Sequence, residues 1–82
     1  MTKTIINREI SVSSFSFNKQ FEALPRRIEF EGRSLTFLGS GIRFLIKNNG
    51  HIIRLFDMSD GEAEYRLRCD NGTAWTLVTI RQ

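Results

Sequence analysis

The sequence has little of the chemistry on which disulfide frameworks, metal sites and most enzymes depend. Its 82 residues include one cysteine, one histidine and one proline. A single cysteine, Cys69, cannot form an internal disulfide and gives no pair of thiolates for structural zinc. We therefore expect a reducing compartment, the cytoplasm, and neither a metal site nor a small-molecule cofactor.

Long apolar runs are also missing. Nowhere do about 18 apolar residues follow one another, as a membrane-spanning helix requires. The first nine residues contain no apolar run of the length found in a signal peptide. We expect a chain that neither crosses a membrane nor carries a secretion signal.

Catalytic groups do not assemble into a recognisable pattern. His51 follows Asn49 and Gly50, which form a turn signal, and Cys69 falls on an apolar face of a predicted strand. No third residue completes a nucleophile, base and orienting group. We predict a protein that is not an enzyme and has no catalytic residues.

Acidic residues gather around Gly61, but their spacing does not match a calcium-binding loop. If Gly61 took the sixth position of a helical calcium loop, Phe56 and Met58 would occupy ligand positions and Leu67 the closing one. Solvation of a turn explains these acids. They are Asp57, Asp60, Glu62 and Glu64.

What the sequence does contain is apolar alternation punctuated by glycine. Hydrophobic residues make up 40% of the chain and charged residues 26%, which is typical of one folded domain over residues 1–82. From residue 25 onward, apolar and polar residues alternate, as in half-buried strands. We predict an all-β fold, an antiparallel meander of about six to seven strands curled into a small barrel or strongly bent sheet.

Turn signals separate the predicted strands of residues 25–82. Two-residue loops are expected at Gly32-Arg33, Ser40-Gly41 and Asn49-Gly50, and a longer loop at residues 57–61. In these registers one face carries two rows of apolar side chains. The rows are Phe30, Leu35, Ile46, Ile53, Tyr65 and Val78, and Ile28, Phe37, Phe44, Leu55, Ala63 and Ile80.

Residues 1–24 have a less regular pattern. The apolar parity changes at Ser13-Ser14, which predicts a strand with a bulge or corner. The spacing of Phe17, Phe21 and Leu24 predicts one short helical turn near residues 18–24. Because a bare apolar face and two free edges favour aggregation, this segment is expected to close the barrel as a seventh strand or to cover it as a lid, unless a second copy does so.

The opposite face of the meander mixes apolar and basic residues and is the predicted binding surface. Aromatic and basic side chains together can stack bases and neutralise phosphates, whereas apolar ones favour protein contacts. The candidates are Arg43, Leu45, Lys47, Ile52, Arg54, Phe56, Arg66, Arg68, Trp75 and Leu77.

Two positions of Trp75 are open. A tight Asn71-Gly72 loop places it outward, opposite Arg68, whereas a three-residue loop, 70–72, turns Trp75 and Leu77 inward. A large aromatic ring is usually more stable when buried.

Charge divides the chain unevenly. Residues 1–54 carry nine Lys or Arg against four Glu, whereas residues 55–82 carry three Arg against five acids. This balance permits nucleic-acid contact without the dense basic stripe that would demand it. We predict a small interaction module that binds another protein or a second copy of itself, with nucleic-acid binding by a small β-barrel as the alternative.

Overall fold

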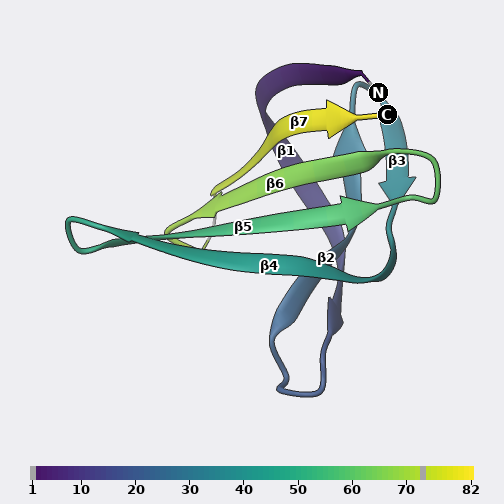
Figure 1. The fold of residues 1–82 in the computed structure, drawn as a ribbon. Coiled ribbons are helices and arrows are strands. Elements are labelled where there is room, and N and C mark those ends of the chain that lie inside the picture. Colours follow the sequence, from purple (N-terminus) through teal and green to yellow (C-terminus); the bar gives the residue numbers. More distant parts are fainter. Residues whose placement is uncertain (1, 73) are drawn as a thin grey trace.

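The protein, described by a computed structural model for residues 2–72 and 74–82, consists of strands and turns (Figure 1). Within those ranges no helix occurs. The seven strands are β1 (Lys3–Phe17), β2 (Ala23–Phe30), β3 (Arg33–Thr36), β4 (Leu38–Asn48), β5 (His51–Ser59), β6 (Glu64–Asp70) and β7 (Ala74–Arg81).

The strands form one antiparallel sheet that curls into a nearly closed barrel. Their order is β3-β2-β1-β7-β6-β5-β4, so the two edge strands, β3 and β4, are consecutive in the chain. In the part of the chain that the structure describes, a seam between β4 and the β2–β3 edge is left without a hydrogen-bonded strand ladder. The predicted all-β barrel or bent sheet is confirmed.

β1 closes the barrel by serving two neighbours. Its first part pairs with β7, from Lys3 to Ile10, and its second part pairs with β2, from Ser11 to Phe17. Register shifts on both sides of Ser14 produce the corner that the change of parity predicts. The N-terminal segment is therefore a seventh strand.

The predicted helical turn near residues 18–24 is wrong. β2 already begins at Ala23, and the preceding residues form a hairpin loop organised by Asn18. The Asn18 carboxamide oxygen accepts hydrogen bonds from the backbone amides of Gln20 and Glu22, at 2.9 and 3.0 Å. Because Phe21 has a φ of 60°, outside the helical region, the asparagine caps a turn and not a helix.

The turn between β2 and β3 differs from the predicted one by a shift of the loop. Glu31 and Gly32 are its central residues, both with positive φ, as a type I′ turn requires. Phe30 therefore pairs with Arg33 and Ile28 with Leu35, in place of the predicted pairs Phe30 with Leu35 and Ile28 with Phe37.

No hairpin forms at Ser40-Gly41. The Phe37 amide donates a hydrogen bond to the Arg26 carbonyl at 2.8 Å, and the chain then continues directly into β4. Gly39 and Gly41 take φ values of 68° and 65° and bend the strand around the barrel instead of reversing it. The predicted pairing of Phe37 with Phe44 is wrong for this reason.

The β4 and β5 part of the predicted apolar face, namely Phe44, Ile46, Ile53 and Leu55, lies on the outside of the barrel. The pairs Ile46 with Ile53 and Phe44 with Leu55 form as predicted. However, β5 extends to Ser59, so Tyr65 pairs with Met58 and not with Ile53. This shift is odd-numbered, and an odd shift turns every side chain of a strand to the other face.

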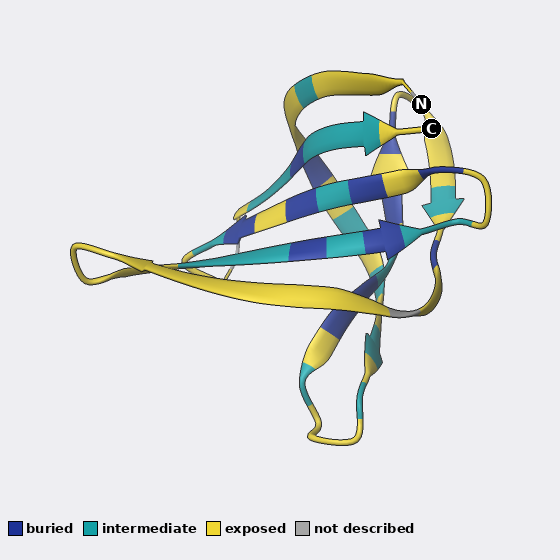
Figure 2. Ribbon diagram, viewed as in Figure 1, coloured by how far each residue is buried: buried dark blue, intermediate teal, exposed yellow. Residues whose placement is uncertain are grey.

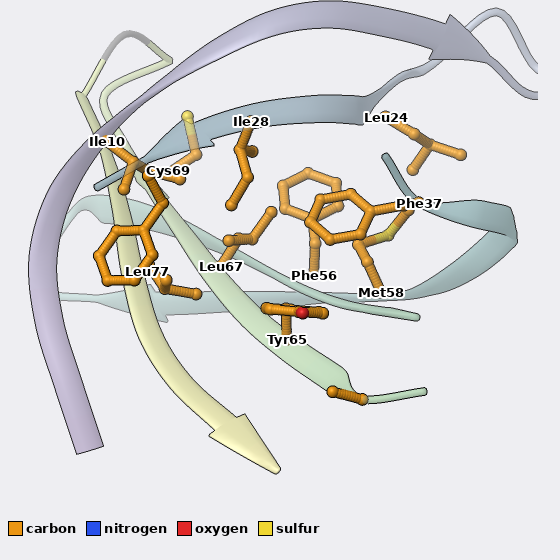
Figure 3. Close-up of a cluster of buried hydrophobic side chains, with 12 residues drawn as sticks. Ile10, Leu24, Ile28, Phe37, Phe56, Met58, Tyr65, Leu67, Cys69 and Leu77 are labelled. Carbon is orange, nitrogen blue, oxygen red and sulfur yellow. The ribbon is translucent and has the colours of Figure 1, made fainter. Parts of the chain in front are cut away.

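Inside the barrel, the core joins side chains from most of the strands (Figure 3). Phe37, Phe56 and Met58 gather beside Leu24, Leu67 lies near the middle of the cluster, and Leu77 lies toward the end that carries Ile10. By contrast, β4 is exposed along the part that extends from the barrel (Figure 2). The buried apolar residues are Ile10, Leu24, Ile28, Phe30, Phe37, Phe56, Met58, Ala63, Tyr65, Leu67, Cys69 and Leu77.

Asp60 organises the connection between β5 and β6. Its carboxylate accepts hydrogen bonds from the amides of Glu62 and Ala63, each at 2.9 Å, and from the Tyr65 hydroxyl at 2.8 Å. Partial burial alone would raise the pKa of Asp60, but these hydrogen bonds outweigh it and lower the pKa. Burial and the same contact raise the pKa of Tyr65 to about 12.

The bend of β4 gives a test with an internal control. A Cβ at Gly41 would lie 2.7 Å from the Asp57 carbonyl oxygen and still closer to the Met58 sulfur, whereas one at Gly39 would meet nothing within 4 Å. Both substitutions to alanine strain a positive φ, but only Gly41→Ala overpacks the core. We expect Gly39→Ala to lower the free energy of unfolding by about 1 kcal/mol and Gly41→Ala by about 2–4 kcal/mol in urea denaturation. Equal losses would contradict this account of the bend.

Asp60 predicts a specific acid sensitivity. Asp60→Ala removes an acceptor for two amides and should lower the free energy of unfolding by about 1–2 kcal/mol at pH 7. Because the pKa of Asp60 is lower in the folded state, its contribution exists above the ordinary aspartate value of about 3.9 and disappears as pH falls through the folded value. Denaturation curves of wild type and variant should therefore converge at low pH. Glu62→Gln, in the same turn but exposed, is the control and should change little.

Candidate functional site

Most of the predicted binding residues share one face, but it is the concave face, which lines the barrel and continues along β4 and β5. Cross-strand pairs place Arg43 beside Phe56, Leu45 beside Arg54 and Lys47 beside Ile52. Phe56 and Leu77 are buried in the core and unavailable to a ligand. Arg66 and Arg68 alternate with the inward residues of β6 and lie on the opposite, convex face.

Trp75 takes the inward position of the two that the sequence allows. It pairs with Cys69, and Leu77 pairs with Leu67, while Asp70 pairs with Ala74. The pairing of Asp70 with Ala74 excludes the tight loop at Asn71-Gly72, and the predicted loop over residues 70–72 is wrong too, because it would have placed Trp75 beside Leu67. The indole is half-buried between Phe56 and Phe15, with ring centroids 5.3 and 6.0 Å away.

Two hairpins extend beyond the barrel as arms (Figure 1). The β1–β2 arm comprises residues 14–25, and the β4–β5 arm comprises residues 43–54. In the sequence, β3 and the bend at Phe37 lie between the two arms. Figure 1 shows that the arms leave the barrel in different directions.

An open groove of about 520 Å³ lies between the two arms. The β1–β2 arm contributes Phe15 and Phe17, the β4–β5 arm contributes Arg43 and Arg54, and Trp75 lies between them. Its full lining is Phe15, Phe17, Glu22, Ala23, Arg43, Arg54, Cys69, Gly72 and Trp75.

Charge in the groove is only partly compensated. Arg43 forms an ion pair with Glu22, which bridges the seam between the arms. Arg54, which is half-buried, forms no ion pair with any residue in the ranges 2–72 and 74–82. Burial raises the pKa of the Cys69 thiol, although the nearby charge of Arg54 acts against that rise. The groove therefore carries net positive charge and an unreactive thiol.

The convex face of the β4–β5 arm is apolar. Ile42, Phe44 and Ile46 project from β4, with Ile42 59% and Ile46 43% exposed. Arg66 lies 5.8 Å from the centre of the Phe44 ring and donates two hydrogen bonds to Asp57, at 2.7 and 2.8 Å. The Arg66 guanidinium is therefore occupied by Phe44 and Asp57. The other exposed side chains of this strip, Ile42 and Ile46, are aliphatic.

Three of the acidic residues around Gly61 make contacts within the protein. Asp57 binds Arg66, Glu64 forms an ion pair with Arg81, and Asp60 caps its turn. Among the residues described, no three side chains of the metal-binding types converge. His51 is exposed at the tip of the β4–β5 arm, and the binding site proposed from sequence does not include it.

The groove residues of the β1–β2 arm, namely Phe15, Phe17 and Glu22, are not among the binding residues predicted from the sequence. Phe15 and Phe17 have the same parity, which was a detectable signal that both rings project from one side of a strand. Their proximity to Arg43 and Trp75 depends on closure of the barrel, for which no local pattern exists.

Trp75 gives a spectroscopic test of the groove. Its emission should be blue-shifted relative to that of the urea-unfolded chain because the ring is half-buried. Phe15→Ala removes one neighbouring ring and should shift the emission toward the red by several nanometres without unfolding the protein. Phe21→Ala, at a residue 86% exposed on the loop of the same arm, should leave the emission unchanged. Identical spectra for both variants would contradict the contact with Phe15.

No helix in the described part of the chain combines the length and hydrophobicity needed to cross a bilayer.

This chain was compared with known protein families, curated proteins and solved structures. Neither the protein-family models nor the curated proteins nor the solved structures contain a match to this chain.

Proposed function

We propose that the protein is an interaction module that associates with a second copy of itself through the edge of β4. The observation that carries this proposal is the apolar exposure of an edge strand. β4 is 11 residues long, or about 37 Å when extended, and pairs on one side only among the residues described. Ile42, Phe44, Leu45 and Ile46 are all exposed large hydrophobics on it.

Such an edge is unstable against association unless it is protected. A long strand with unpaired amides and carbonyls is a template for pairing with another chain, and natural proteins protect these edges with charge, proline or a bulge. β4 has bulge-forming glycines only before Ile42, and its exposed half carries Arg43 and Lys47 on the concave face alone. Apart from Arg66 beside Phe44, no charged side chain among the residues described covers the convex side of the strand, so a matching apolar surface is the partner that fits it.

The sequence of β4 is compatible with itself in an antiparallel pair. If two copies pair about Phe44, Ile42 of each copy lies opposite Ile46 of the other, and the apolar strips become continuous. In the same register Arg43 lies opposite Leu45 and Lys47 opposite Gly41, so no two like charges lie directly opposite each other. The pair would join two seven-stranded sheets edge to edge.

The test is the oligomeric state of the intact protein by sedimentation equilibrium at concentrations from about 1 to 200 μM. We expect a monomer–dimer equilibrium that changes little between 50 and 500 mM salt, because the contact is apolar. Ile46→Lys places a charge in the centre of the strip and should weaken the dimer at least tenfold.

Ile5→Lys is the matched control, since Ile5 is 70% exposed but lies near the start of β1. It should leave the dimer unaffected. A wild-type protein that remains monomeric throughout the concentration range would refute the proposal, as would equal weakening by both substitutions.

A further inference from the structure

The groove between the two arms joins exposed aromatic rings to uncompensated positive charge. We propose that this groove, together with the concave face of the β4–β5 arm, binds single-stranded nucleic acid. Phe15 and Phe17 supply ring faces for the bases, and Arg54 and Lys47 supply positive charge for the phosphates. This surface shares Arg43 and Lys47 with the edge of β4 that the proposed dimer pairs, whereas the apolar strip of β4 lies on the opposite, convex face of the strand.

The rings are placed for stacking. Phe17 is 67% and Phe15 45% exposed, and both line the groove from the same side of β1. The Trp75 ring packs against Phe15, with the two ring centroids 6.0 Å apart. Stacking on aromatic side chains does not depend on base identity, because every base has a π-face.

The positive charges lie across the groove from these rings. Arg54 lines it and has no ion-pair partner among the residues described, so it can meet a phosphate without breaking an existing contact. Arg43 is shared with Glu22, but its guanidinium has further N–H donors. Bases directed toward β1 would leave the phosphates along β4 and β5.

The charge continues outward from the groove, which favours a chain over a small ligand. Lys47 lies on the same concave face as Arg43 and Leu45, four and two residues away along a strand in which alternate side chains share a face. It does not line the groove, so a ligand confined there would not use it. A single-stranded nucleic acid that enters the groove and continues along the β4–β5 arm would contact both Arg54 and Lys47.

Single strands fit this surface better than a duplex. Stacking on Phe15 and Phe17 needs base faces that are free, whereas those of a duplex are already stacked. Because rings and cations recognise features common to all nucleotides, binding should be largely independent of sequence.

The experiment is a titration of Trp75 fluorescence with a ten-residue oligothymidylate at 20–200 mM salt. We expect the emission to change on binding and the affinity to fall with salt. Each phosphate contact in a single strand contributes a slope of about −0.7 in log affinity against log salt, so two or three contacts give about −1.4 to −2.1. The titration is repeated with Ile46→Lys, which weakens the dimer but leaves the concave face unchanged, so this variant should bind the oligonucleotide at least as tightly as wild type does.

Four variants define the surface. Arg54→Gln and Lys47→Gln should each weaken binding several-fold at low salt and reduce the slope by about 0.7. Phe17→Ala should weaken binding at least fivefold with the slope unchanged, since stacking releases no counterion. Glu22→Gln frees Arg43 from its ion pair while preserving the amide contact to Asn18, and should strengthen binding.

Arg68→Gln is the matched control, because Arg68 is an exposed arginine on the convex face with its own partner, Asp70. It should bind the oligonucleotide like wild type. Losses equal to those of Arg54→Gln would show diffuse electrostatic attraction and overturn the proposal. So would an absence of binding at 20 mM salt, equal affinity for a duplex, or equal affinity for thymidine monophosphate, which would indicate a small-molecule site.

Discussion

The close packing of the β4 backbone on Met58 at Gly41 is the contact on which the arrangement of the barrel depends. Because of this contact, the chain can go from one edge strand, β3, to the other, β4, without forming a hairpin. Between the two strands, the Phe37 side chain is buried in the core. Once β4 lies so close to β5, the side chains of Phe56 and Met58 have only the barrel interior available. The alternate side chains of β4, Ile42, Phe44 and Ile46, then lie on the convex face.

That division explains why a small protein exposes so many apolar side chains. Among the residues described, the buried apolar side chains come from β1, β2, β5, β6 and β7 and from the connections at Phe37 and Ala63, while Leu35 of β3 packs against them. β4 therefore adds little to the core, although it carries five large apolar residues, Leu38, Ile42, Phe44, Leu45 and Ile46. Its role in stability is mainly to pair with β5, which leaves its convex side chains available to another surface.

Much of the fold could be predicted from period-two alternation and turn chemistry, because both are local. The Asn49-Gly50 hairpin, the pairs that flank it and the corner at Ser14 depend on residues within one hairpin or strand. The face of β5 could not be predicted, since it depends on how far the strand continues before Asp60 caps the turn. One odd shift there exchanged the inner and outer faces of β4 and β5. The mixed set of basic and apolar candidates was thus identified largely as a group, but assigned to the wrong side of the sheet.

The ion pair between Arg43 and Glu22 has a consequence for how the protein responds to any ligand. It is the salt bridge that spans the seam, so it contributes to holding the arms at a fixed separation. A ligand that draws Arg43 away from Glu22 removes that restraint, and by thermodynamic reciprocity any change that loosens the seam alters affinity for that ligand by the same factor. Binding of a ligand in the groove would therefore widen the opening of the barrel, and widening of the opening would in turn strengthen binding of that ligand.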